Sequence, residues 1–140
     1  MNSALKIKMF SITLDTNNAH ELADFYAALL GWEKRCDDSK FIEISLQKGD
    51  PLFRGEYPFI WIQENQDNKP PIWPEEPEAQ QQMVHIDFAV SNIEKAIQHA
   101  LDCGAKKSVE QYSDNWTVMF DPAGHPFCLA QIKSFFNTNK

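Results

Sequence analysis

A histidine and an aspartate stand two positions apart in a short alternating segment, residues 84–90. Apolar Ile86 and Phe88 alternate there with His85 and Asp87, which is the period of a β-strand with two unlike faces. The imidazole and the carboxylate are therefore predicted to share one face of the strand. An imidazole beside a carboxylate is a donor pair that borderline divalent cations bind, so this face is a candidate functional site.

The strand is predicted to lead directly into a helix. Ser91 and Glu94 have the spacing of a capping box, so we expect the helix to begin at Ser91. Gly104 is a typical residue for ending it. Between them lies one apolar helical stripe, made of Ile93, Ala96, Ile97, Ala100 and Leu101.

Residues 10–31 repeat this order of strand, cap, apolar stripe and glycine. The cap is predicted at Asn18, and the glycine is Gly31. Aligning the two strands places Ser11 on His85 and Thr13 on Asp87, 74 residues apart, whereas the glycines are 73 apart. We therefore expect an internal duplication whose copies differ by one residue near the helix start.

The remaining pattern predicts three more strands in each copy. In the first copy one strand starts at Trp32 and ends in a turn at 36–39, and two more cover 41–46 and 57–63. In the second copy the strands are expected at 105–110, 116–120 and 126–132, with a tight turn at 121–125.

The predicted fold class is α+β, with two βαβββ modules. We expect one domain over residues 1–140, built from module one (about 8–64), a proline-rich linker (65–82) and module two (83–133). Trp73 in the linker either pins it to the body or covers a pocket.

Charge and cysteine content limit which partners and which cellular location are expected. The formal net charge is −7, and no basic run is longer than Lys106-Lys107, which argues against a nucleic-acid partner. The three cysteines have no C-x-x-C spacing, and we find neither a signal peptide nor a long apolar run. The expectation is a cytoplasmic protein with no membrane partner.

Three motifs in the same order resemble the vicinal-oxygen-chelate superfamily, which includes glyoxalase I, bleomycin-resistance proteins and extradiol dioxygenases. They are F-Y-A-A-L-L-G-W-E at 25–33, H-I-D-F-A-V-S at 85–91 and D-P-A-G-H-P-F-C-L at 121–129. The likeness is to the glyoxalase-like branch. It implies the glyoxalase/bleomycin-resistance fold, in which the two modules form a curled mixed sheet shaped as a cup.

The resemblance also implies where a metal would lie. Metal-binding members take four ligands from the first and last strands of each module, a His or Gln and a Glu from each half. By position these become Ser11, Trp61, His85 and Cys128, of which only His85 keeps the expected type. We therefore predict no cofactor; if a divalent metal is bound, His85 would hold it with Cys128 or Asp87.

Cys128 and His85 could also have roles other than metal binding. Cys128 can be a small buried apolar residue, or a nucleophile activated by His85 if its thiolate is stabilised. His85 can simply be hydrogen-bonded to Asp87 or to the Ser11 hydroxyl.

The predicted function is binding of a small organic molecule in the cup, because aromatic walls with a few polar groups suit such ligands. The alternative is a divalent-metal-dependent lyase, isomerase or dioxygenase that uses His85 with non-standard ligands. A third possibility is an interaction module whose cup is filled by its own side chains. Bulky Phe135, Phe136 and Trp73 outside the repeats predict a homodimer. The predicted cup residues are Ser11, Thr13, Trp61, Gln63, His85, Asp87, Trp116 and Cys128.

Overall fold

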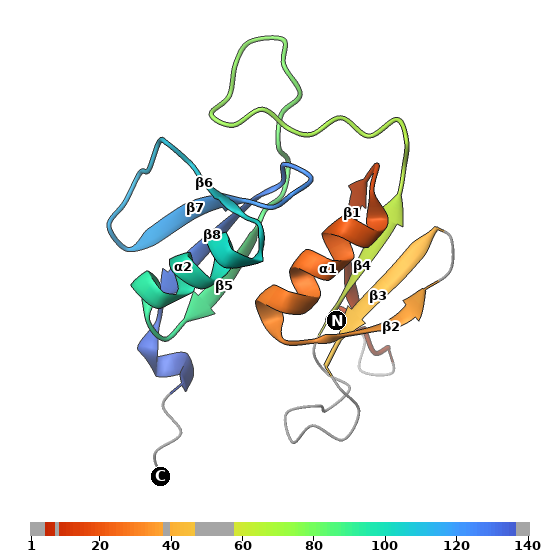
Figure 1. The fold of residues 1–140 in the computed structure, drawn as a ribbon, viewed down its shortest axis with the longest axis horizontal. Coiled ribbons are helices and arrows are strands. Elements are labelled where there is room, and N and C mark those ends of the chain that lie inside the picture. The colour runs from red at the N-terminus through yellow and green to blue at the C-terminus, as the bar shows by residue number, and fades with distance from the viewer. Residues whose placement is uncertain (1–4, 8, 38–39, 47–57, 137–140) are drawn as a thin grey trace. The chain divides into compact units, whose positions relative to one another are not determined.

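The structure is a computed structural model, and it describes residues 5–7, 9–37, 40–46 and 58–136. The chain forms two compact units, Met1–Gln66 and Asp67–Lys140, each built on a four-stranded mixed sheet with one α-helix (Figure 1). The fold class is α+β with two βαβββ modules, as predicted.

Module one runs β1 Ser11–Thr16, α1 Ala19–Leu30, β2 Glu33–Asp37, β3 Phe41–Ser45 and β4 Phe59–Glu64. The strand order in its sheet is β1-β4-β3-β2. β1 is parallel to β4, and the other pairs are antiparallel. This arrangement places the first and last strands of the module side by side.

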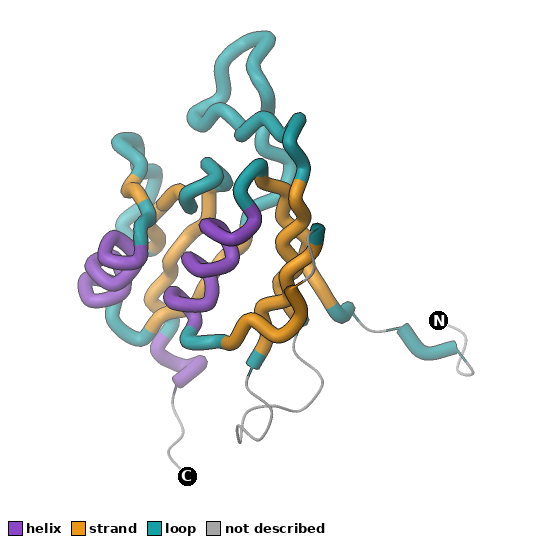
Figure 2. The backbone as a smooth tube through the Cα atoms, turned by 45° about the vertical axis from the view of Figure 1, so that its right-hand side comes forward, coloured by secondary structure: helices purple, strands orange, loops and turns teal. Residues whose placement is uncertain are grey.

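Helix α1 covers one face of the module-one sheet, where it packs on β3 and β4 (Figure 2). Its apolar stripe is buried, and so are the alternate strand residues beneath it. The buried residues are Leu22, Phe25, Tyr26, Ile42, Ile44, Ile60 and Ile62. The residues between them on each strand therefore point to the opposite, more polar face.

Module two runs β5 Ile86–Val90, α2 Ile93–Cys103, β6 Lys106–Lys107, β7 Trp116–Phe120 and β8 Pro126–Gln131, followed by the short 3-10 helix η1 Lys133–Phe136. Its strand order is β5-β8-β7-β6, with β5 parallel to β8. The two sheets therefore have the same topology. None of the helices in the described ranges is both long and apolar enough to cross a membrane.

The helix caps correct one prediction. Asn18 caps α1 as expected, and its Oδ1 accepts a hydrogen bond from the Glu21 amide at 3.2 Å. In α2 the cap is Asn92, not Ser91, because its extended backbone aims Oδ1 at the Lys95 amide, 3.0 Å away. The caps are thus 74 residues apart, and the one-residue difference lies in the helix lengths of 12 and 11 residues.

Two strand boundaries also differ from the predictions. β6 is limited to Lys106–Lys107 instead of 105–110, because the Gln111 side chain takes the place of a strand partner. Its amide donates to the Val118 carbonyl at 2.9 Å and accepts from the Val118 amide at 2.8 Å. β2 continues through Asp37, where a turn was predicted, with a register shift between Lys34 and Cys36.

The proline-rich segment from Asp67 onward belongs to the second unit. The Trp73 ring meets the Tyr112 ring edge-on at 6.0 Å, which favours the reading of Trp73 as a pin. Trp73 also lines a cavity of about 340 Å³ together with Pro70, Pro71 and Phe120. At this end of module two the segment passes so close to the β7–β8 turn that a Cβ on Gly124 would lie 2.8 Å from Pro70.

Strand register confirms the internal duplication. Thr13 is paired with Trp61 across β1 and β4, and Asp87 is paired with Cys128 across β5 and β8. Thr13 and Asp87 are the residues that the 74-residue offset aligns. Trp61 and Cys128 therefore occupy equivalent places in the two modules.

Candidate functional site

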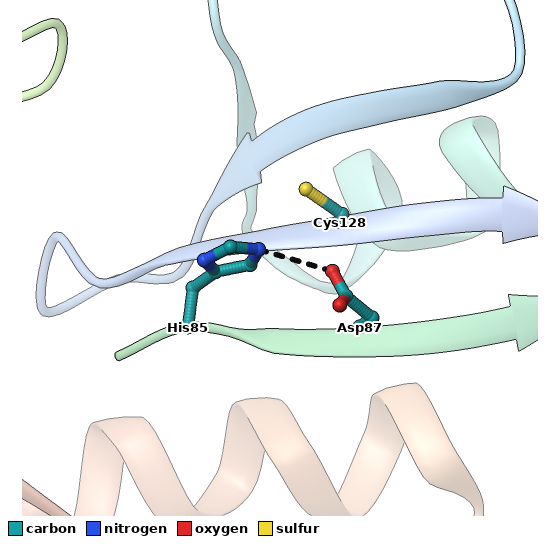
Figure 3. A group of neighbouring side chains, drawn as sticks. All are labelled: His85, Asp87 and Cys128. Carbon is teal, nitrogen blue, oxygen red and sulfur yellow. Dashed lines mark ion pairs between the residues drawn. The ribbon is translucent and has the colours of Figure 1, made fainter. Parts of the chain in front are cut away.

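Module two brings three of the predicted site residues together. His85 lies just before β5, Asp87 lies within it, and Cys128 lies opposite Asp87 on β8 (Figure 3). Their potential ligand atoms all lie within 4.8 Å of one another. The parallel pairing of β5 with β8 thus brings Cys128 next to the His85 and Asp87 side chains.

Within this cluster the imidazole and the carboxylate are directly paired. His85 Nε2 lies 3.1 Å from Asp87 Oδ1 (Figure 3). The side chains of His85 and Asp87 are 36% and 69% exposed, whereas Cys128 is only 7% exposed. The cluster therefore presents a solvent-accessible contact between an imidazole and a carboxylate beside a buried thiol.

The Cys128 thiol is held in its protonated form. Burial raises the pKa of Cys128 to about 11, and the negative charge of Asp87 and a hydrogen bond to its carboxylate act in the same direction. A nucleophilic cysteine needs the opposite, a lowered pKa. The cluster therefore argues against Cys128 as a nucleophile activated by His85.

Module one presents a different face at the equivalent place. Thr13 faces Trp61, and Gln63 lies two residues further along β4 on the same side. The Trp61 and Phe41 rings meet edge-on at 5.7 Å. Trp61 Nε1 is buried and has no acceptor among the residues that the structure describes.

Sequence reasoning missed two residues of this face, Phe41 and Glu43. Glu43 on β3 is paired with Trp61 on β4, and its Oε2 accepts a hydrogen bond from the Ser45 hydroxyl at 3.0 Å. The alternation in 41–46 was visible in the sequence. The strand register that places Glu43 beside Trp61 was not.

Two other predicted site residues, Ser11 and Trp116, lie on other strands. Ser11 is paired with Phe59 in module one. Trp116 is paired with Ala130, two residues beyond Cys128 on β8, and is 43% exposed. No described contact joins Trp116 to His85, Asp87 or Cys128.

Comparison with known proteins identifies the family. Residues 11–130 match the family model of the glyoxalase-like domain. The chain belongs to the glyoxalase-like domain family. This glyoxalase-like protein shares its fold with solved structures that include a glyoxalase/bleomycin resistance protein/dioxygenase family enzyme, in agreement with the fold that the sequence motifs implied.

Solved structures with the same fold include proteins of several kinds. A glyoxalase family protein of Enterococcus faecalis is 22% identical, with a TM-score of 0.59 over 89% of this chain and 97% of that chain. Glyoxalase I of Leishmania major is 16% identical, with a TM-score of 0.62 over 94% and 91%. A fosfomycin resistance protein of Listeria monocytogenes is 16% identical, with a TM-score of 0.64 over 91% and 95%. These identities show a shared fold alone.

No curated protein matches the chain.

The resemblance to the superfamily implies a four-ligand divalent centre. That centre draws two ligands from each module, but Ser11 and Trp61 stand at the module-one positions. In the described part of the chain, the only group of three His, Cys, Asp or Glu side chains with converging ligand atoms is that of His85, Asp87 and Cys128. Within the described residues, this group is therefore the candidate for holding a metal.

Proposed function

We propose that this glyoxalase-like protein binds a small organic molecule on the polar face of its module-one sheet, without the four-ligand metal centre of its superfamily. One observation carries the proposal. Where module two has Cys128 opposite Asp87, module one has Trp61 opposite Thr13, with a buried indole N–H that lacks an acceptor in the described part of the chain.

A buried donor without an acceptor is uncommon in folded proteins, because leaving it unpaired costs free energy. A bound ligand that offers an acceptor to Trp61 Nε1 would remove this cost. Aromatic side chains beside a few polar groups are the usual lining of small-molecule sites. Trp61 and Phe41 with Thr13 and Gln63 form such a lining on module one.

A thermal-shift screen of small organic molecules tests the proposal. We expect compounds that raise the melting temperature of the wild-type protein but lose most of this effect in Trp61→Phe, which keeps an aromatic ring and removes the N–H. Trp32→Phe is the matched control and should respond like the wild type. If no compound discriminates Trp61→Phe from the wild type, the proposed binding face is wrong.

A metal-dependent lyase, isomerase or dioxygenase is the second candidate, and the converging His85, Asp87 and Cys128 donors favour it. Three protein ligands of nitrogen, oxygen and sulfur suit a catalytic zinc ion, which would act as a Lewis acid when bound. Binding would require Cys128 to give up its proton and Asp87 to give up its pairing with His85.

A further inference from the structure

We propose that the polar face of module one selects small organic cations, and that Glu43 determines this selectivity. The inference rests on the proposed function and adds the charge class of the ligand. It depends on the described residues of module one alone.

Glu43 lies next to two aromatic residues on this face. It is paired with Trp61 across β3 and β4, and Phe41 precedes it by two residues on the same side of β3. Its side chain is half-buried, and its one described hydrogen bond comes from the Ser45 hydroxyl. A hydroxyl donor supplies no counter-charge to the Glu43 carboxylate.

The other charged groups nearby do not supply that counter-charge. Lys34 is paired with buried Ile44, and its Nζ lies 2.6 Å from Asp24 on α1, so it points to the helix-covered face. The Arg35 guanidinium lies 3.9 Å from Glu33 and donates to the Leu46 carbonyl. Within the described part of module one, no basic side chain pairs with Glu43.

One further acidic group, Asp15, adds to the negative charge of this face. Asp15 lies on it next to Gln63, and its carboxylate accepts a hydrogen bond from the Asn65 amide group rather than from a cation. An anionic ligand here would be repelled by partly desolvated carboxylates. A cationic ligand would gain an ion pair with Glu43 and the attraction of an ammonium group for the Trp61 and Phe41 rings.

The buried indole N–H specifies the rest of the ligand. Because Trp61 Nε1 has no acceptor in the described chain, the ligand should carry an acceptor as well as a cationic group. The predicted class is therefore an amine or guanidine on an aromatic or similarly flat skeleton that also bears an oxygen or nitrogen acceptor.

Three matched probes test the charge preference. Tyramine, tyrosol and 4-hydroxyphenylacetate share a phenol and differ chiefly in a positive, neutral or negative end group. Each is titrated into the full chain while the NMR signal of the Trp61 indole N–H, assigned with Trp61→Phe, is followed. We expect tyramine to bind at least about tenfold more tightly than 4-hydroxyphenylacetate, with tyrosol between them.

Glu43 variants assign the preference to one side chain. Glu43→Gln should reduce the tyramine preference to about threefold or less, whereas Glu43→Asp should keep most of it because the charge is retained. Glu21→Gln, an exposed change of the same type at the start of α1, should behave like the wild type. Denaturation midpoints of all variants verify that each is folded.

The outcomes separate this inference from the proposed function. Equal affinity for the three probes, or tighter binding of 4-hydroxyphenylacetate, overturns the cation preference while leaving ligand binding at Trp61 intact. A preference that survives Glu43→Gln shows that Glu43 is not its source. If neither these probes nor any compound of the wider screen moves the Trp61 signal at up to about 10 mM, both proposals fail.

Discussion

Asp87 faces Cys128 across the parallel β5–β8 pair, and its carboxylate helps to keep the Cys128 thiol protonated. The neutral Cys128 thiol is thus hydrogen-bonded to the Asp87 carboxylate. The His85 imidazole contacts the same carboxylate. This arrangement stabilises the folded protein with Cys128 protonated and disfavours formation of the Cys128 thiolate. Its consequences can be measured without knowing the ligand.

The first prediction concerns alkaline pH. The pKa of Cys128 is about 11 in the folded protein and about 8.5 in an unfolded chain, so the unfolded state loses this proton first. The contribution of Cys128 to stability is therefore complete below about pH 8.5 and is lost as the pH rises toward about 11. Urea midpoints should fall more steeply across this range in the wild type than in Cys128→Ala. Parallel pH profiles of the two proteins would refute the raised pKa.

The second prediction concerns thiol reactivity. Asp87→Asn removes the charge that helps to raise the pKa of Cys128, so its alkylation by iodoacetamide at pH 8 should become faster. Mass spectrometry of the peptide containing Cys128 follows the reaction, and the Cys103 peptide is the internal control. An unchanged rate would mean that burial alone protects the thiol.

The third prediction concerns metal content. We expect well below one equivalent of any transition metal in protein purified without a chelator, because Ser11 and Trp61 stand at the expected ligand positions of module one and Cys128 retains its proton. Elemental analysis decides this. About one equivalent of zinc, nickel, manganese or iron that disappears in His85→Ala would favour the enzyme candidate instead.

The fourth prediction separates the two faces of β5. His85→Ala should cost at most about 1 kcal/mol of unfolding free energy, because its contact with Asp87 is partly exposed. Phe88→Ala should cost more, about 2–3 kcal/mol, because its ring packs on Phe127 at 5.8 Å. Denaturant midpoints give the comparison. Equal losses would make His85 a structural residue with no special claim to a ligand site.

The fifth prediction concerns assembly. Phe135 and Phe136 of η1 are 71% and 47% exposed, and neighbouring Ile132 is 39% exposed. Contiguous apolar residues of this kind mark interaction surfaces, so we propose a homodimer. Light scattering at micromolar concentration should give twice the mass of the chain, and the double variant Phe135→Ser/Phe136→Ser should shift the protein to monomer. A wild-type monomer contradicts the proposal.

Much of the fold could be predicted because its signals are local. Alternation located β1, β3 and β5, and the spacing of Asn18 and Gly31 gave the ends of α1. The errors arose where side chains compete for backbone groups. Ser91 and Asn92 are both good caps, and the backbone conformation of Asn92 decides between them. The Gln111 amide ends β6 through contacts that no sequence period encodes.

The candidate site was predictable only within a strand. The pattern H-x-D placed His85 and Asp87 on one face, and the 3.1 Å contact agrees with that prediction. Pairing Cys128 with them needed the family resemblance, since 41 residues separate Asp87 from Cys128. Glu43 was overlooked because its importance comes from its pairing with Trp61 across β3 and β4. The register between two strands cannot be predicted from the local sequence pattern of either strand.

The side chain of Gln111 has a protective consequence. The unpaired backbone groups of an exposed strand invite another strand to dock, which is how sheets from different molecules aggregate. Beyond the two residues of β6, the amide and carbonyl of Val118 are both satisfied by Gln111, and the Ser108 amide also donates to that carbonyl. Gln111 thus occupies the backbone groups of Val118 with which an incoming strand could pair, and Gln111→Ala would expose them.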